Sequence, residues 1–142
     1  MNLTLHFSLE ELIRSDVALR KGIDNTPSAE QIEKLRVLAQ HLEEVRAIVG
    51  PLYINSGYRS PALNAAVGSV PSSQHVLCEA ADVISLDGYT PIQMCRMVRD
   101  NGILYDQLIH EFGAWMHISF GSRSRKQLLT INANGTVDGL WA

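Results

Sequence analysis

The sequence predicts an α+β fold in which helices pack on a largely antiparallel sheet. Helical patterns dominate the first half of the chain and strand patterns dominate the last third, an order that is typical of α+β proteins. The chain has 142 residues, of which 46% are hydrophobic and 19% are charged. This is a globular composition at the ordinary size of one domain. No repeat or long linker divides the sequence, so we expect residues 1–142 to form a single domain.

Capping residues and apolar spacing predict the helices. Ser8 with Glu11 has the spacing of a capping box at the start of a short helix. Ser28 with Gln31 has the same spacing and opens a longer helix that ends at Gly50. One face of the longer helix is apolar, with residues three and four positions apart: Ile32, Leu35, Leu38, Leu42, Val45 and Ile48. Two further helices are expected after Ser60-Pro61 and over residues 90–99.

Six segments have the composition of strands and are bounded by turn residues. The last two would form a hairpin around Asn134-Gly135. Residues 68–74 are rich in Gly, Ser and Pro and predict a loop. The six segments cover residues 52–55, 80–84, 105–111, 115–120, 127–132 and 137–140.

Charge and hydropathy exclude several classes of protein. Twelve basic residues against 15 acidic ones give a net charge of −3, so we expect no nucleic-acid-binding surface. No stretch approaches the roughly 20 apolar residues of a membrane helix, so no membrane insertion is expected. Because the first residues lack the pattern of a secretory signal, we expect synthesis in the cytoplasm. Cys78 and Cys95 then predict reduced thiols, and we expect a monomer.

His75, Asp82 and His117 are candidate metal ligands. Asp82 lies in the apolar segment 80–84, and an isolated carboxylate is costly in such a setting unless a partner such as a metal is present. Strand alternation over residues 115–120 places His117 on the face opposite the apolar residues. Two histidines and one carboxylate are a usual ligand set for catalytic zinc. From the residues alone, the alternative of a core histidine, an exposed histidine and a capping aspartate stays open.

Three motifs follow one another along the chain: Ser56-Gly57-Tyr58-Arg59-Ser60-Pro61, the segment of residues 73–82, and Trp115-Met116-His117. In this order they resemble the motifs of the zinc D-Ala-D-Ala carboxypeptidase family. Residues 73–82 align without a gap with the family's S-x-H-x-x-G-x-A-x-D hallmark. The family includes D,D-dipeptidases and phage L-alanyl-D-glutamate endopeptidases, and it shares its fold with the hedgehog signalling domain. The resemblance covers residues 27–120 and implies a fold of the hedgehog/DD-peptidase type.

The resemblance implies roles for five residues. One zinc ion (Zn²⁺) per chain would be held by His75, Asp82 and His117. Arg59 would face the substrate and stabilise negative charge on the carbonyl oxygen, for which a fixed guanidinium is suited. Ser73 would be a substrate-side serine. The alternatives are a surface salt bridge for Arg59 and a plain loop or capping role for Ser73.

Two positions depart from the family pattern. Cys78 stands where the family has Gly, which is strained if the backbone there has positive φ and tolerated if the site only requires a small buried residue. A thiol there could also compete for zinc. Ala114 stands where many relatives have an acid three residues before the last His. Glu111 is then the predicted general base if residues 105–111 and 115–120 form a hairpin, as in some phage-type members; His110 and a solvated role for Glu111 are the alternatives.

These features together predict a zinc metallopeptidase that hydrolyses amide bonds. The family resemblance implies the substrate class, which is peptidoglycan stem peptides containing D-amino acids, and the D,D-carboxypeptidase or L,D-endopeptidase type. We expect a phage or prophage lytic enzyme that reaches the cell wall after phage-mediated release. The alternative is a non-catalytic zinc-binding module of the hedgehog kind, or a phage structural component, which the changes at Cys78 and Ala114 would favour. A helical regulator without metal is disfavoured, since it leaves Asp82 unexplained.

Overall fold

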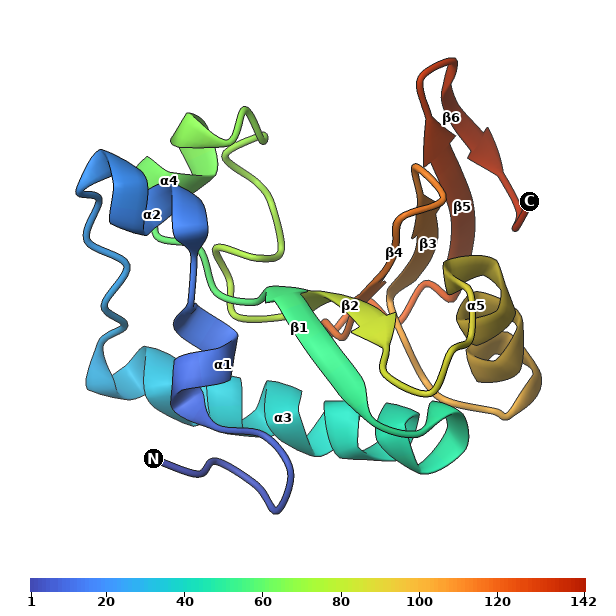
Figure 1. Cartoon of the computed structure of the whole chain (residues 1–142), viewed down its shortest axis with the longest axis horizontal. Coiled ribbons are helices and arrows are strands. Elements are labelled where there is room, and N and C mark those ends of the chain that lie inside the picture. Colours follow the sequence, from blue (N-terminus) through green and yellow to red (C-terminus); the bar gives the residue numbers. More distant parts are fainter.

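A six-stranded sheet organises the molecule in the computed structural model, which describes all 142 residues (Figure 1). The strand order is β1-β2-β4-β3-β5-β6. All neighbours are antiparallel except β3 and β5, which are parallel. The α+β class with a largely antiparallel sheet is therefore confirmed. The strands are β1 (Leu52–Ser56), β2 (Ala80–Ser85), β3 (Gln107–Glu111), β4 (Trp115–Ser119), β5 (Gln127–Asn132) and β6 (Gly135–Asp138).

The helices begin at the capping residues that predict them. The side chains of Ser8, Ser28 and Thr90 each accept a hydrogen bond from the backbone N–H of the third residue of the following helix. The side chain of that third residue accepts one from the backbone N–H of the capping residue. One helix was missed, because it has only six residues between Ser15 and a left-handed Gly22. None of the helices has the length and apolar character needed to cross a membrane. The helices are α1 (Leu9–Ile13), α2 (Asp16–Lys21), α3 (Ala29–Val49), α4 (Pro61–Ala66) and α5 (Pro91–Asp100).

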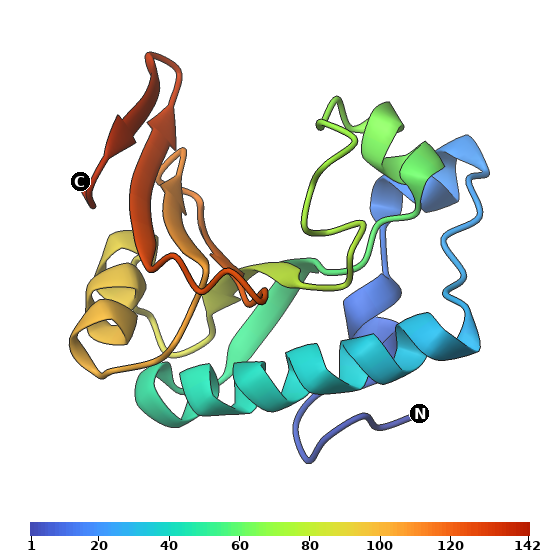
Figure 2. The same ribbon diagram turned by 180° about the vertical axis from the view of Figure 1, so that it is seen from behind.

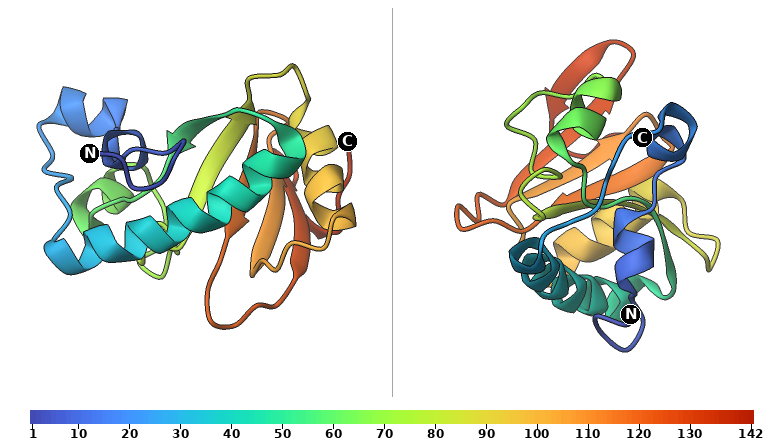
Figure 3. Two further views of the ribbon diagram at one scale, coloured as in Figure 1. Left: turned by 90° about the horizontal axis from the view of Figure 1, so that it is seen from below. Right: turned by 90° about the vertical axis from the view of Figure 1, so that its left-hand side faces the viewer.

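The hydrophobic core lies between the long helices and one face of the sheet. From α3, Leu35 and Leu42 are fully buried. Figure 2 and the left panel of Figure 3 show α3 running the length of the molecule, with α5 beside its C-terminal end. From β4, Met116 and Ile118 are fully buried on the same side. Burial of each such side chain stabilises the fold by about 2 kcal/mol. The same contacts therefore hold the helices in place and determine which face of β4 points to the core.

The other face of the sheet carries polar residues, and we call it the site face. Alternation along β4 turns His117 away from the core. The register pairs His117 with Asp82 of β2 and with Ile109 of β3. Glu111 pairs with Trp115 at the end of the same hairpin. Side chains from three neighbouring strands therefore stand together on this face.

Candidate active site

Three buried side chains converge at one point on the site face. His75, Asp82 and His117 each offer a ligand atom, and these atoms lie within 4.8 Å of one another. The Nε2 atom of His75 is 3.3 Å from Oδ1 of Asp82, and Nδ1 of His117 is 2.8 Å from the same oxygen. The cluster thus joins β2, β4 and the loop that precedes β2.

One separation in the cluster already equals that between two ligands of a tetrahedral zinc ion. Bonds of about 2.0–2.2 Å at tetrahedral angles place two zinc ligands roughly 3.3–3.6 Å apart. His75 and Asp82 already have this separation. The shorter hydrogen bond between His117 and Asp82 is one that a metal would replace, because ligand atoms lose their protons on binding. Two imidazoles and one carboxylate leave a fourth position open for water.

A backbone carbonyl fixes the orientation of His75. Its Nδ1 lies 2.7 Å from the carbonyl oxygen of Gly57. Because a carbonyl can only accept, Nδ1 must carry the proton, and Nε2 keeps a lone pair directed at the cluster. Such an outer contact is the usual way in which a ligating histidine is held. The loop that ends β1 therefore orients a ligand that belongs to a different segment.

Asp82 is ionised by its surroundings. Burial raises the pKa of its carboxyl, but the charges and hydrogen bonds of His75 and His117 outweigh burial and hold that pKa well below its usual range. The pKa of His75 is lowered, mainly by burial. For His117, burial also opposes the charged form, but the hydrogen bond to Asp82 prevails and raises the pKa. The carboxylate is thus partnered on both sides, and Asp82 is not a helix cap.

Arg59 reaches the cluster from the segment between β1 and α4. Its guanidinium donates from Nε to Ser56 Oγ at 3.1 Å and from Nη1 to Asn64 Oδ1 at 3.4 Å. Nη2 lies 3.5 Å from Oδ2 of Asp82. Asn64 is itself buried and donates to the carbonyl of Val70. The guanidinium is therefore held beside the cluster with its planar fork fixed, and it is no surface salt bridge.

Glu111 also lies at the cluster. Its Oε1 is 3.7 Å from Nδ1 of His117. Burial, followed by the charge of Asp82, raises the pKa of the Glu111 carboxyl. The predicted hairpin is present, with Glu111 opposite Trp115, so Glu111 is not a solvated turn residue. His110 faces the other side of the sheet, with its Nδ1 2.7 Å from the carbonyl of Trp141, and cannot replace Glu111 at the cluster.

An open cleft of about 650 Å³ surrounds the cluster. Ser73 lines this cleft. Its hydroxyl oxygen also accepts a hydrogen bond from the backbone N–H of His75, which stabilises the loop before the cluster. The indole N–H of Trp115 has no hydrogen-bond partner, although it is close enough to Glu111 to lower that carboxyl's pKa slightly. Ala114 is exposed in the turn and takes no part. The cleft is lined by Arg59, Val67, Gly68, Ser69, Val70, Ser73, His75, Asp82, Glu111, Phe112, Trp115, His117 and Ile131.

The motifs on these elements match a known family. A family model described as Peptidase M15 matches residues 5–119. The chain belongs to the peptidase M15 family. M15 peptidases are zinc-dependent metallopeptidases, and the family implies a peptidoglycan substrate. The buried His-Asp-His cluster of this chain is able to hold such a metal. A comparison with curated proteins gives no match.

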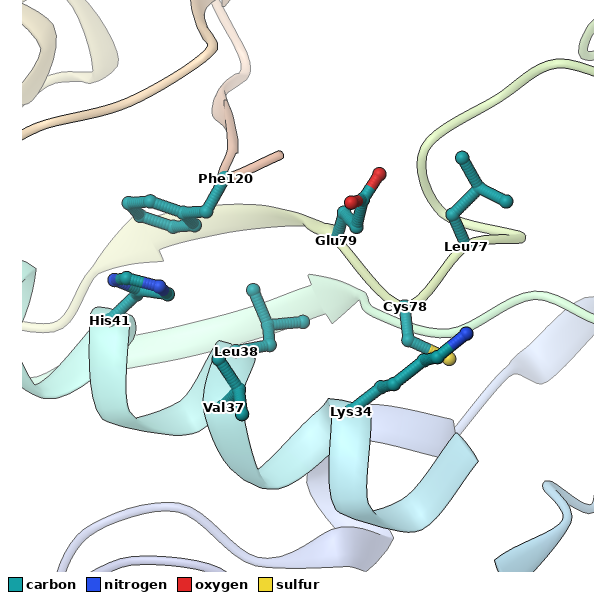
Figure 4. Close-up of a pocket in the computed structure, with 8 residues that line it drawn as sticks. All are labelled: Lys34, Val37, Leu38, His41, Leu77, Cys78, Glu79 and Phe120. Carbon is teal, nitrogen blue, oxygen red and sulfur yellow. The ribbon is translucent and has the colours of Figure 1, made fainter. Parts of the chain in front are cut away.

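In this M15 peptidase, the departure at Cys78 has a structural consequence. Cys78 is buried and adopts a φ of 62°, the left-handed conformation that glycine tolerates best. Its side chain points toward Lys34 of α3 rather than toward the ligands, into a separate hollow of about 290 Å³ (Figure 4). Burial raises the pKa of the thiol to about 11. Cys78 is therefore a strained, neutral core residue outside the M15 metal cluster.

Sequence reasoning missed a charged contact behind the M15 metal site. Asp106 is fully buried and accepts from Gln74 Nε2 at 2.8 Å and from Arg125 Nε at 2.7 Å. Hydrogen bonds from Arg125 are the main reason that the pKa of Asp106 is strongly lowered. Gln74 immediately precedes the ligand His75, so Asp106 ties the ligand loop to the start of β3. The position of Asp106 beside the apolar segment of β3 could have indicated a buried carboxylate, but nothing in the local sequence indicates Arg125 as its partner.

Proposed function

We propose that the protein is a zinc peptidase that hydrolyses an amide bond in peptidoglycan stem peptides, with His75, Asp82 and His117 as ligands of one zinc ion per chain. The observation that carries the proposal is the place of Glu111. The partly buried Glu111 carboxylate has its oxygen 3.7 Å from Nδ1 of His117, which supports a role for it as the general base beside the proposed metal. Its raised pKa and its place on the cleft wall favour catalysis over a binding module.

Each catalytic residue of the cleft has a separate role in the proposed reaction. Zinc, when bound, supplies Lewis-acid chemistry that lowers the pKa of water and polarises a carbonyl. Glu111 takes a proton from the attacking water at its carboxylate and then gives that proton to the nitrogen of the leaving amine. Its raised pKa brings it nearer to neutral pH, which favours both transfers. Arg59 donates hydrogen bonds to the carbonyl oxygen as negative charge develops there.

Ser73 is proposed as a contact to the peptide substrate. It lines the same cleft as Glu111 and Trp115. Its hydroxyl oxygen accepts from the backbone of His75, which leaves the O–H free to donate to a peptide carbonyl. The serine would thus position the chain that Arg59 and Glu111 act on.

The test is digestion of purified peptidoglycan by the zinc-loaded protein, with the cleaved bond identified by mass spectrometry. We expect Glu111→Gln to keep the fold and the zinc, because Gln has nearly the same shape, and to lose roughly 10²–10⁴ in rate. Ala114→Gln is the matched control in the same hairpin and should digest at the wild-type rate, because Ala114 is exposed outside the cleft.

The outcomes separate the functions. Near-wild-type turnover by Glu111→Gln would remove Glu111 from the mechanism. Zinc binding without any digestion by the wild-type protein would instead favour the non-catalytic zinc module. Full metal content in Asp82→Ala and His117→Ala would contradict the ligand assignment, since each variant should lose the metal.

The biological setting that we propose is cell-wall lysis by a phage or prophage. It rests on the resemblance of the Asp106-Gln107-Leu108-Ile109 segment, Glu111 and the Trp115-Met116-His117 motif to phage-type members. Purified protein should then clear a suspension of cells whose outer barriers have been permeabilised, and Glu111→Gln should not. Failure to clear cells with digestible peptidoglycan would contradict the lytic role while leaving the peptidase activity in place.

A further inference from the structure

A second hollow adjoins the catalytic cleft beside Arg59. It has a volume of about 260 Å³ and shares Arg59 and Val67 with the cleft. Its other walls come from the connection between α1 and α2, the start of α2, the end of β1, and α4: Arg14, Ser15, Asp16, Val17, Asn55, Ser56 and Leu63. A peptide lying across the metal site toward β1 would reach this hollow next, and we call it the Arg14 subsite.

Arg14 presents a positioned cation in the Arg14 subsite. Its guanidinium lies over the ring of Tyr53, 4.8 Å from the ring centroid. Nη2 donates to the carbonyl of Ile54 at 3.1 Å. Tyr53 pairs with Ile84 of β2, two residues beyond Asp82, so the stacked pair stands on the site face. Ring stacking and one hydrogen bond fix the guanidinium and leave its remaining N–H groups free.

Asp16 presents a carboxylate to the same hollow. Both Arg14 and Asp16 are exposed, and neither takes part in any ion pair of the chain, with each other or with another residue. The Arg14 subsite therefore offers one charge of each sign with no neutralising partner. An amino-acid head group, with a free ammonium and a free carboxylate on one carbon, has the complementary pair of charges.

We propose that the Arg14 subsite binds a free amino-acid head group carried on a side branch of the peptide substrate. Arg14 takes the carboxylate through its planar fork, and Asp16 takes the ammonium. The proposal rests on the proposed function, since it assigns specificity to the same cleft. Because both residues are exposed to solvent, the pair is expected to change affinity by roughly tenfold rather than by orders of magnitude.

Two soluble tripeptides test the proposal. One is L-Ala-γ-D-Glu-diaminopimelate, whose branch ends in an ammonium and a carboxylate, and the other is L-Ala-γ-D-Glu-L-Lys, whose branch ends in an ammonium alone. Binding of each is measured by calorimetry with zinc-loaded Glu111→Gln protein. We expect the diaminopimelate peptide to bind roughly tenfold more tightly. Adding Arg14→Ala should abolish this preference by weakening the binding of that peptide only.

A matched control and a second variant show whether the preference depends on the subsite itself. Arg20→Ala removes an exposed arginine of α2 that does not line the subsite, and it should leave the preference intact. Asp16→Asn leaves the Arg14–Tyr53 stacking untouched and should weaken both peptides alike, because both carry the ammonium. Equal affinity for the two peptides before Arg14 is changed, or a preference that survives Arg14→Ala, would overturn the proposal. A preserved preference in a protein whose wild-type form digests no purified peptidoglycan would support the subsite and overturn the peptidase function.

Discussion

Arg59 is held by three partners at once, and this decides what a substitution there should do. A lysine keeps the positive charge but cannot donate to Ser56, Asn64 and a substrate oxygen from one planar group. We expect Arg59→Lys to bind zinc normally and to lose on the order of 10²–10³ in kcat, the usual cost of one oxyanion donor. Steady-state kinetics with metal analysis measures both. Arg20→Lys, on the exposed side of α2, is the control, and an unchanged kcat in Arg59→Lys would make Arg59 structural.

At Cys78 we expect the Gly variant to be more stable than the Ala variant, the reverse of the usual order. At positive φ an alanine is less stable than glycine by about 1 kcal/mol, so Cys78→Gly should have a higher free energy of unfolding than Cys78→Ala. Cys95 is also buried but lies inside α5, where Gly should be less stable than Ala by about 1 kcal/mol. Urea unfolding of the four variants provides the comparison. The same order at both positions would show that position 78 relaxes out of the left-handed conformation.

The sequence predicts those residues of the candidate site that stand out from the local pattern of apolar and polar residues. Asp82 stands out because a carboxylate interrupts an apolar strand, and alternation alone turns His117 away from the core. Glu111 follows from the hairpin register. The contact of Asp106 with Arg125 could not be predicted in the same way, because it depends on how the loop after β4 returns to the sheet.

At the scale of elements, Asp106 links the ligand loop, β3 and the loop of residues 121–126. Its folded pKa is depressed, so the stabilisation is complete above the unfolded pKa of about 3.9 and is lost as pH falls toward the folded value. We therefore expect the free energy of unfolding of metal-free wild-type protein to fall more steeply between pH 5 and 3 than that of Asp106→Asn. At pH 7 the variant should be less stable by about 2–3 kcal/mol.

Urea unfolding at several pH values measures this difference. Asp100→Asn is the control, because Asp100 pairs with Arg99 on the surface and should change little. Parallel pH profiles for the wild type and Asp106→Asn would show that Asp106 does not carry the acid sensitivity.

The elements differ in how far sequence could define them. α3 has both a capping box and a long apolar stripe, and its bounds were predicted closely. α2 has only the cap at Ser15 and Gly22, and six residues show too little periodicity to be distinguished from a turn. The parallel pairing of β3 with β5 could not be predicted, since it depends on the tertiary path of the intervening β4.

For the whole molecule, we propose that residues 1–142 unfold as one domain and that zinc stabilises it. A core cluster of 24 residues is shared by α1, α3, α5 and the sheet, so circular dichroism and tryptophan fluorescence should give one coincident transition. Zinc at 100 times its Kd adds about 2.7 kcal/mol and should raise Tm by roughly 5–10 °C. His75→Ala should abolish the shift. The shift should also shrink as pH falls, because protons compete with zinc for the two histidines. Two separate transitions would contradict the single domain.

The contact between Gly57 and α1 has a consequence for how this metal site can change by mutation. The backbone N–H of Tyr58 donates to the carbonyl of Leu12 at 2.7 Å, and a Cβ on Gly57 would collide with that same carbonyl. The Gly57 oxygen that sets the tautomer of His75 belongs to the main chain, so no codon change at any position can delete it. A mutation can therefore affect this acceptor only by moving it. Any side chain at residue 57 would do so, because its Cβ would push the main chain away from Leu12.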